Sequence, residues 1–414
     1  MELLRFFTAG NVDDGKSTLI GRLLYDSNSI STDIIETLSR QSKIKTEDTK
    51  IDLALLTDGL RAEREQGITI DVAYKFFSTP KRKFIIADTP GHFQYTRNMF
   101  TGSSNSDLAI ILIDARIGIT EQTRRHTILS SVIGIPHLTV CINKMDMVDF
   151  SEESFLKIKN EFLEFSSKLN LEDIQFFPIS ALQGDNVVNQ SKNMNWYSGP
   201  PLLKFLEDVT IKSRRRSSKS RLQVQYVIRP QTKELPDYRG YAGTVSGGKF
   251  FVGQKVKILP AVLESKISRI ELKTKDVSEA EIDEPIVLHL ETEIDISRGD
   301  WIVEAGGEIQ SGKELKALLL WMDNDPFRSD LKYIFQQSSF QTKVKISSLD
   351  YKISYENYSK ETNINSLNLN ELAGITLKTA DPVFYDSYEE NHNSGSFILI
   401  NESTNSTVAA GVLL

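Results

Sequence analysis

Short apolar runs alternate with helix-like stretches over about the first 210 residues of the chain. Each run is apolar at successive positions rather than at every second one, which is typical of strands buried on both faces of a parallel sheet. The stretches between them, such as 121–133 and 154–169, have the periodicity of helices. This alternation predicts an α/β domain with a mostly parallel, doubly wound sheet. The predicted strands are 4–9, 84–87, 108–113, 138–142 and 176–179.

Small or polar residues follow several of these runs directly: Gly10, Asp88, Asn143 and Ser180. Because strands of a parallel sheet point the same way, these residues are expected along one edge of the sheet. Ligands of such sheets bind beyond the carboxyl ends of the strands. The pattern therefore predicts a single ligand site at this edge.

A different pattern begins near residue 222. Short segments with alternating polarity and intervening turn residues extend to about 305 and predict a small antiparallel β-barrel domain. Strand-like segments continue over 315–414, between connections rich in Asn and Ser, and predict a second barrel. The predicted domains are 1–212, 213–310 and 311–414. The strand-like segments include 222–228, 240–245, 253–258, 286–290, 301–303, 316–322 and 397–400.

The charge pattern bears on the partners. The chain has 56 acidic and 49 basic residues, a net charge of -7. Proteins that bind a nucleic-acid backbone usually carry a basic face, so no nucleic-acid partner is expected. Residues 212–221 are the exception, because they are basic and rich in serine. We interpret them as a solvated interdomain linker, with a contact to an acidic partner or a polynucleotide as the alternative.

The composition otherwise fits a multi-domain globular protein, with 414 residues, 40% hydrophobic and 25% charged. No apolar run reaches the ~18 residues that a membrane helix needs, and the N-terminal residues leave no room for a signal peptide. A cytoplasmic location without membrane contact is therefore expected. Cys141, the single cysteine, lies in a predicted strand, so we expect a buried core residue rather than a nucleophile.

Residues 10–17, Gly-Asn-Val-Asp-Asp-Gly-Lys-Ser, match the phosphate-loop (P-loop) pattern G-x-x-x-x-G-K-[ST] between a predicted strand and a helix-like stretch. The glycines let successive N–H groups face phosphate oxygens. Lys16 can reach the β- and γ-phosphates of a nucleotide and Ser17 can ligate Mg²⁺, while a helix expected to begin near Thr18 adds its positive end. The predicted contacts are Gly10, Asn11, Val12, Asp13, Asp14, Gly15, Lys16, Ser17 and Thr18.

A second motif, Asp88-Thr89-Pro90-Gly91-His92, follows another predicted strand. Asp88 can reach Mg²⁺ through water, and the Gly91 N–H can bind a γ-phosphate. His92 can position or polarise the attacking water. Thr69, within the Gly-Ile-Thr-Ile segment 67–70, can ligate Mg²⁺ while a γ-phosphate is bound, which makes this segment a switch. The predicted catalytic residues are His92, Lys16 and Thr69, and the predicted metal ligands are Ser17, Thr69 and Asp88.

Two further motifs are expected to recognise the base of the nucleotide. In Asn143-Lys144-Met145-Asp146, the Asp146 carboxylate can accept the N1–H and the N2 amine of guanine, whereas adenine has neither donor at those positions. Ser180-Ala181-Leu182 would bring backbone N–H groups near guanine O6. Neither of these two motifs is specific alone, but together with the P-loop and the Asp88 motif, in this order, they predict a P-loop GTPase domain that uses GTP and Mg²⁺. All residues of these two motifs are predicted GTP contacts, as are Asp88, Thr89, Pro90, Gly91 and His92.

The order of the motifs, with His92 after Asp-Thr-Pro-Gly and two barrels following, resembles the translational GTPase superfamily. Within it, several segments resemble the large, GTPase subunit of sulfate adenylyltransferase. Elongation factors of the tRNA-carrying type usually have His where Asp14 stands and Thr where Ser17 stands. The resemblance is dense to about residue 305 and thin thereafter. The segments that carry it are 10–18, 57–79, 88–102, 224–230, 237–244 and 293–300.

The resemblance implies a subunit that hydrolyses GTP and couples this to a reaction of a separate small subunit, which forms adenosine 5′-phosphosulfate and pyrophosphate from ATP and sulfate. It implies a hetero-oligomer with that small subunit as partner. The alternative is an elongation-factor-like GTPase that carries aminoacyl-tRNA, which the acidic balance disfavours. The small subunit's Ser-Gly-Gly-x-Asp-Ser loop has only a partial counterpart at 246–249, which we interpret as a hairpin turn.

Overall fold

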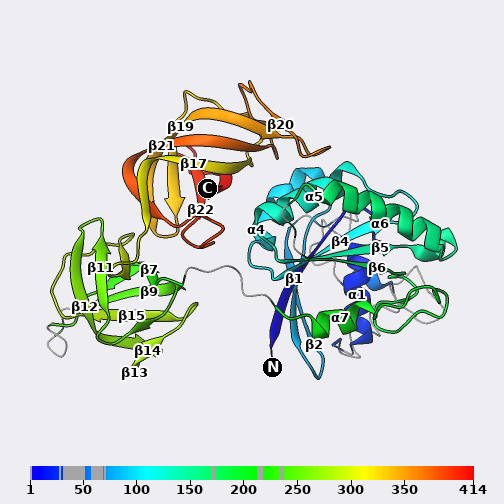
Figure 1. Cartoon of the computed structure of the whole chain (residues 1–414), viewed down its shortest axis with the longest axis horizontal. Coiled ribbons are helices and arrows are strands. Elements are labelled where there is room, and N and C mark those ends of the chain that lie inside the picture. Colours follow the sequence, from blue (N-terminus) through cyan, green and yellow to red (C-terminus); the bar gives the residue numbers. More distant parts are fainter. Residues whose placement is uncertain are drawn as a thin grey trace. The chain divides into compact units, whose positions relative to one another are not determined.

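The computed structural model describes residues 2–27, 29–30, 52–56, 69, 71–169, 171, 173–211, 218–230, 232 and 237–414. The chain forms two compact units, Met1–Arg214 with Ser354–Ser359 and Arg215–Ile353 with Lys360–Leu414 (Figure 1). The division into three domains at 212 and 310 stays a prediction. Within the described ranges no helix is both long and apolar enough to cross a membrane. The cytoplasmic location also stays a prediction.

The first unit contains a six-stranded sheet with the order β2-β3-β1-β4-β5-β6. All neighbouring strands are parallel except β2, which pairs antiparallel with β3. The predicted α/β fold with a mostly parallel sheet is therefore confirmed. The strands are β1 (Leu3–Ala9), β2 (Ala73–Ser78), β3 (Lys83–Asp88), β4 (Leu108–Asp114), β5 (His137–Asn143) and β6 (Ile174–Pro178).

Helices cover both faces of this sheet, with α1 and α7 on one face (Figure 1). These two helices share an apolar cluster with side chains from the strands. Cys141 of β5 belongs to this cluster and is fully buried, as predicted. Burial raises the pKa of its thiol, which makes it a poor nucleophile. The helices are α1 (Lys16–Asp26), η1 (Leu53–Leu56), η2 (Phe93–Tyr95), α4 (Thr96–Ser103), α5 (Glu121–Val132), η3 (Met145–Val148), α6 (Glu152–Ser166) and α7 (Leu202–Asp208).

The edge strand β2 has no counterpart among the predicted strands. Phe77 is buried and stacks on Phe84 at 4.4 Å between ring centroids, whereas Tyr74 and Phe76 are more than half exposed. An edge strand with one solvated face does not need a continuous apolar run. The criterion that finds strands buried on both faces therefore misses it.

The second unit contains two antiparallel barrels, as predicted. In each barrel six strands close into a ring, in the orders β11-β16-β7-β9-β15-β12 and β18-β22-β23-β17-β21-β19. Each encloses its own apolar cluster. The first barrel comprises β7 (Arg221–Gln223), β9 (Gly240–Gly247), β11 (Lys255–Leu259), β12 (Leu263–Leu272), β15 (Pro285–Leu290) and β16 (Trp301–Glu304). The second comprises β17 (Gln310–Trp321), β18 (Tyr333–Gln337), β19 (Phe340–Ile353), β21 (Leu372–Tyr385), β22 (Ser396–Asn401) and β23 (Thr407–Leu413).

Short strands accompany the two barrels, and two of the predicted strands show how the observed bounds differ from the predicted ones. The predicted strand 222–228 is two strands, because the pairing is interrupted after Gln223: Arg221–Gln223 pairs with both β16 and β9, whereas Tyr226–Ile228 pairs with β9. The predicted strand 253–258 begins only at Lys255, because Gly253 has φ +87° in a turn. The short strands are β8 (Tyr226–Ile228), β10 (Phe250–Phe251), β13 (Lys275–Val277), β14 (Glu279–Ala280) and β20 (Lys360–Glu361).

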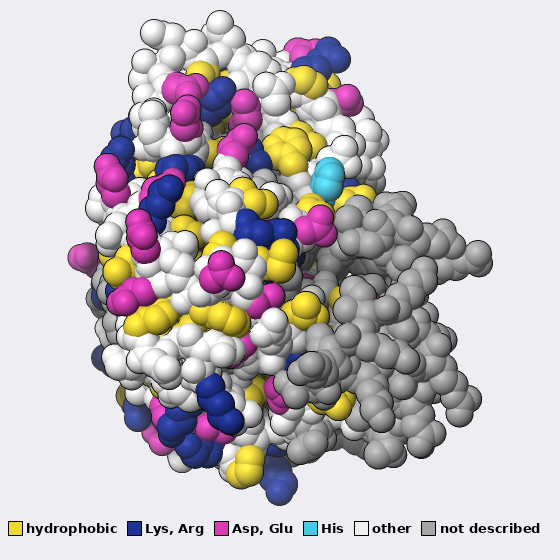
Figure 2. Space-filling model, turned by 90° about the vertical axis from the view of Figure 1, so that its right-hand side faces the viewer, with side chains coloured by type: hydrophobic (Ala, Val, Ile, Leu, Met, Phe, Trp, Pro, Cys, Tyr) yellow, Lys and Arg dark blue, Asp and Glu magenta, His cyan; other side chains and the backbone are white. Residues whose placement is uncertain are grey.

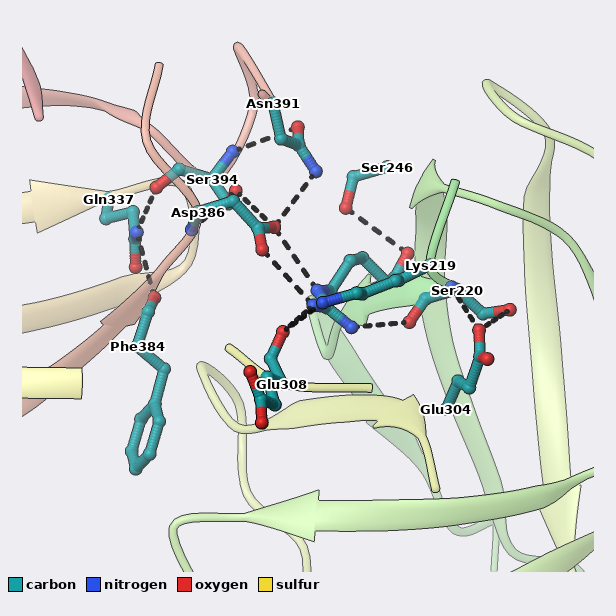
Figure 3. A network of polar contacts seen from close by, with 11 residues as sticks. Lys219, Ser220, Ser246, Glu304, Glu308, Gln337, Phe384, Asp386, Asn391 and Ser394 are labelled. Atoms are coloured by element: carbon teal, nitrogen blue, oxygen red, sulfur yellow. Dashed lines mark hydrogen bonds and ion pairs between the residues drawn. The ribbon is translucent and has the colours of Figure 1, made fainter. Parts of the chain in front are cut away.

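Arg221 corrects the interpretation of the basic stretch 212–221 as a solvated linker at its last residue, whereas Ser218 and Lys219 are exposed. Residues 212–217 lie outside the described part of the chain, but Arg221 begins β7 and is fully buried. Its Nε and Nη2 each lie 3.2 Å from the Asp386 carboxylate. Asp386 also accepts a hydrogen bond from Ser394 Oγ (Figure 3). The ion pair thus joins the first barrel to the turn that follows β21. An acidic partner 165 positions away is not visible in the local sequence.

We predict that Arg221→Met lowers the stability of the second unit by about 3 kcal/mol, because it leaves the buried Asp386 carboxylate without its countercharge. Chemical unfolding of the full chain measures this. Arg328→Met is the matched control, because Arg328 pairs with Asp330 while both side chains are about two-thirds exposed. Exposed pairs contribute little to stability, so this variant should unfold as the wild type does. Equal behaviour of the two variants would contradict the prediction.

Candidate functional site

The P-loop connects β1 to α1 at the carboxyl edge of the sheet. Helix α1 begins at Lys16, earlier than expected, and the loop backbone is in the left-handed region at Asp13 and Gly15. The buried Lys16 Nζ donates to the carbonyl oxygens of Asn11 at 2.7 Å and Gly10 at 3.3 Å. Its ammonium is thus held inside the loop, where a phosphate would lie.

Asp14 forms a hydrogen bond within the P-loop. Its Oδ2 accepts the Asn11 N–H at 2.6 Å, and its side chain is 3% exposed. Burial raises the pKa of this carboxyl to about 6, although Lys16 and the hydrogen bond from Asn11 favour the charged form. The same burial lowers the pKa of Lys16. Val12, Ser17 and Thr18 are half-buried and Asp13 is exposed.

The segment after β3 lies directly against the P-loop. Asp88 ends the strand, is buried, and accepts a hydrogen bond from Thr8 Oγ1 at 3.3 Å. Thr89 Oγ1 donates to the Thr8 carbonyl at 2.6 Å. At Gly91, a Cβ atom would lie 2.4 Å from Lys16 Nζ and 2.8 Å from the Gly10 carbonyl oxygen. Glycine is therefore required at position 91, and the structure brings the first two motifs together.

His92 precedes the short helix η2 and is half-buried. Its Nδ1 accepts the Gln94 N–H at 3.4 Å. In a neutral ring with this contact, the proton is on Nε2. His92 can therefore present an N–H donor next to the Gly91 segment, while Pro90 beside it is buried.

Asn143 links the base motifs to the P-loop. Its Nδ2 donates to the Asp14 carbonyl at 2.7 Å, and its Oδ1 accepts the Ala181 N–H at 2.9 Å. Gly15 packs against it so closely that a Cβ atom there would lie 2.4 Å from Asn143 Nδ2. One amide at the end of β5 thus connects the loops that follow β1, β5 and β6. Ser180 is buried, and its Oγ accepts the Gln183 N–H at 3.2 Å.

Asp146 lies in η3, just after the buried Met145. Its Oδ1 is buried, and no group among the described residues hydrogen-bonds to it. An unpartnered buried carboxylate oxygen is costly and is found where a ligand or a functional constraint accounts for it. The N1–H and N2 donors of guanine fit this acceptor.

Lys144 contacts a residue that the motifs do not identify. Its Nζ lies 2.9 Å from Asp114 Oδ2, and Asp114 also accepts hydrogen bonds from the backbone and guanidinium of Arg116. Burial alone would raise the pKa of Asp114, but the bonds from Arg116 and Lys144 outweigh it and hold the pKa at about 2. Asp114 ends β4, and this position at the end of a predicted strand is the sequence feature that could have identified it as a site residue.

Thr69 is half-buried, and its neighbours Gly67, Ile68 and Ile70 lie outside the described residues. Its contact with the other motifs therefore stays a prediction. The described residues contain no group of three His, Cys, Asp or Glu side chains that could hold a metal ion. Ser17 and Asp88 instead offer one hydroxyl and one carboxylate at adjoining ends of α1 and β3, and these hard oxygen donors suit Mg²⁺.

Two buried side chains near the site have no motif that identifies them. His126 of α5 is fully buried, and its Nδ1 accepts the Gly10 N–H at 3.1 Å. Burial lowers the pKa of His126 to about 3, so the ring is neutral and can accept this bond. Arg22 of α1 donates to the carbonyls of Ala181 and Leu182. Both contacts join residues that are more than 100 positions apart, so no local sequence pattern predicts them.

Comparison with known proteins agrees with this geometry. The profile of the elongation factor Tu GTP binding domain matches residues 1–226, and that of the GTP-eEF1A C-terminal domain-like family matches 314–414. The first unit is therefore a GTP-binding domain. Among solved structures, the GTP-bound Ski7 GTPase-like domain of S. cerevisiae has a TM-score of 0.53, with 19% identity over 100% of this chain and 97% of that one, which shows a shared fold.

Curated relatives match over the whole chain. Sulfate adenylyltransferase subunit 1 of Saccharophagus degradans is 48% identical over 414 residues, which cover 100% of this chain and 87% of the relative. The same subunit of Yersinia pestis is 48% identical, with 99% and 85% covered. The bifunctional enzyme CysN/CysC of Mycobacterium tuberculosis is also 48% identical, with 100% of this chain and 67% of the relative covered.

Proposed function

Because this chain belongs to the family of sulfate adenylyltransferase subunit 1, within the translational GTPase superfamily, we propose that it is the GTP-hydrolysing subunit of a sulfate-activating complex. A separate small subunit would form adenosine 5′-phosphosulfate and pyrophosphate from ATP and sulfate. The observation that carries this proposal is identity of 48% over all 414 residues to a subunit 1 protein. The word subunit in that name supports an assembly with a second chain.

The phosphates of GTP would bind in the P-loop formed by residues 10–18. Lys16 Nζ, which now donates to two carbonyl oxygens, would find stronger acceptors in the β- and γ-phosphates. Bound Mg²⁺ supplies positive charge at these phosphates, and Ser17, Asp88 and Thr69 are its proposed ligands. The close packing of Gly91 on Lys16 supports a direct response of the 88–92 segment to the γ-phosphate.

The guanine base would bind between Asp146 and the loop 180–182. The unpartnered Oδ1 of Asp146 supports this, because guanine supplies the missing donors. Lys144 and Met145 would hold the motif in place, the first through Asp114 and the second by burial. Asn143 fixes the distance between this pocket and the P-loop through its two hydrogen bonds.

Hydrolysis requires a water in line with the γ-phosphate. We assign its positioning to His92, whose ring orientation is supported by the bond from the Gln94 N–H. The Lys16 ammonium would stabilise the charge that develops on the phosphate oxygens. Thr69 completes the proposed catalytic set as a metal ligand.

The face of the molecule in view in Figure 2 offers no support for the aminoacyl-tRNA carrier. On the face in view in Figure 2, Lys and Arg side chains of the described residues are interspersed with Asp and Glu rather than gathered in one basic patch. Backbone binding to a nucleic acid needs clustered positive charge. Full-length identity to subunit 1 relatives favours the sulfate-activating complex over this alternative.

Reconstitution tests the proposed function. We expect GTP to raise sulfate-dependent pyrophosphate release when the chain is combined with a sulfate adenylyltransferase small subunit, ATP and Mg²⁺, because formation of the sulfuric–phosphoric anhydride is strongly unfavourable alone. A non-hydrolysable GTP analogue is the control and should give no stimulation. Equal pyrophosphate release with and without GTP would reject the coupling, and binding of aminoacyl-tRNA with GTP would favour the alternative.

A further inference from the structure

Arg22 is a buried cation that contacts the loop 180–182, which is part of the proposed base pocket. It lies in the middle of α1 and its side chain is 4% exposed. Its Nε donates to the Ala181 carbonyl at 3.1 Å, its Nη2 donates to the Leu182 carbonyl, and its Nη1 lies 3.6 Å from Asp26. A buried guanidinium needs such partners, and two of the three belong to the loop after β6.

The loop packs on this side chain through a glycine. Gly184 has φ +88°, a conformation that favours glycine, and a Cβ atom there would lie in ordinary contact, 3.5 Å from Arg22 Cζ. The Gly184 N–H donates to the Ser180 carbonyl at 2.7 Å, which folds the loop back over the guanidinium. Arg22 therefore holds a tight turn rather than a freely moving segment.

Peptide geometry then decides where the N–H groups of this loop point. In a trans peptide the carbonyl and the following N–H point in opposite directions. Since the Ala181 carbonyl is turned to Arg22, the Leu182 N–H is directed away from it. The Ala181 N–H is already used, because it donates to Asn143 Oδ1. Among the described residues none accepts the Leu182 N–H.

We propose that Arg22 is a positioning residue for base selection, which fixes the Ala181–Leu182 peptide so that the Leu182 N–H donates to the 6-oxo group of guanine. This inference rests on the proposed guanine site. Adenine carries an amino group at that position, so the fixed N–H would meet another donor. Through this contact Arg22 would support a second discrimination between guanine and adenine, in addition to the one made by Asp146. Because α1 also carries Lys16, one helix supports both the phosphate and the base contacts.

The test compares two nucleotides that differ at this position. GDP has the 6-oxo group and an N1–H, and 2-aminopurine riboside 5′-diphosphate has neither. The missing N1–H weakens binding of the 2-aminopurine nucleotide to the wild type and to the variants alike, so the effect of a variant on each nucleotide is compared with the wild type. For Arg22→Met in the full chain, we expect affinity for GDP to fall about tenfold and affinity for the 2-aminopurine nucleotide to change by less than about threefold. Competition against a fluorescent GDP derivative measures both constants. Arg22→Lys keeps the charge but replaces the planar guanidinium, whose two nitrogens reach two carbonyls, with a single ammonium, so its effect should have the same sign and be smaller.

Arg82→Met is the matched control. Arg82 is also buried and also donates to two backbone carbonyls, those of Leu206 at 3.0 Å and Val209 at 2.6 Å at the end of α7. Its loss should lower stability and leave the ratio of the two affinities unchanged. Equal weakening of both nucleotides by the Arg22 variants would overturn the inference and leave the guanine site standing. A wild type that binds both nucleotides equally would overturn the guanine site itself.

Discussion

Asp146→Asn is expected to change the base preference of the protein from guanine to xanthine. The variant loses two charge-assisted hydrogen bonds to N1–H and N2, so GTP affinity should fall by about a hundredfold or more. Its amide can donate to the C2 carbonyl of xanthine, so xanthosine triphosphate should bind more tightly than GTP. Competition of both triphosphates against a fluorescent GDP derivative measures the exchange of preference.

Asp149→Asn is the control for this substitution. Asp149 is exposed, closes the same short helix η3, and has φ +52°, a conformation that Asn accepts. It removes the same charge three residues away without touching the proposed base contact. Unchanged nucleotide preference in Asp146→Asn, or the same shift in both variants, would refute the base-recognition role of Asp146.

His92→Ala is expected to slow GTP hydrolysis by about a hundredfold or more while GTP affinity changes by less than about threefold. The reason is that His92 is assigned to the attacking water and not to a bond with the bound nucleotide. Single-turnover hydrolysis, measured for the chain alone and with the small subunit, gives the rate, and a fluorescent GTP analogue gives the affinity.

Gln94→Ala is the control for the histidine. Its backbone N–H, which bonds to His92 Nδ1, is retained, and the Gln94 side chain is exposed. This variant should hydrolyse GTP at the wild-type rate. If His92→Ala also turned over at the wild-type rate, His92 would have no part in the mechanism. A parallel loss of affinity and rate would assign it to binding instead.

Much of the site lies in contiguous motifs, and for a physical reason. A P-loop binds phosphate with N–H groups of consecutive residues, so residues 10–17 carry nearly the whole arrangement in one stretch. The structure places Asp88, Asn143 and Ser180 at the ends of, or just beyond, strands β3, β5 and β6, as a parallel sheet requires. Their roles toward GTP stay predictions, and so does that of Thr69.

Motifs did not identify the residues whose partners lie far away in the sequence. Arg22 meets a loop 159 positions later, and His126 accepts a bond from a loop 116 positions earlier. Asp114 ends an apolar strand like other polar residues of the site, yet only its contacts with Lys144 and Arg116 give it a role. The sequence around each of these residues is ordinary.

By itself, the sequence determined the alternation of strands and helices, the two barrels and the order of the nucleotide motifs. These depend on periodicity and on neighbouring residues, which interact whatever the rest of the chain does. Only the tertiary structure decided that β2 completes the sheet as an edge strand, that Arg221 is buried against Asp386, and that Arg22 holds the loop at Ala181. Whether a charged side chain is solvated or buried depends on which distant segments pack against it in the folded chain. The residues next to it in the sequence do not determine this packing.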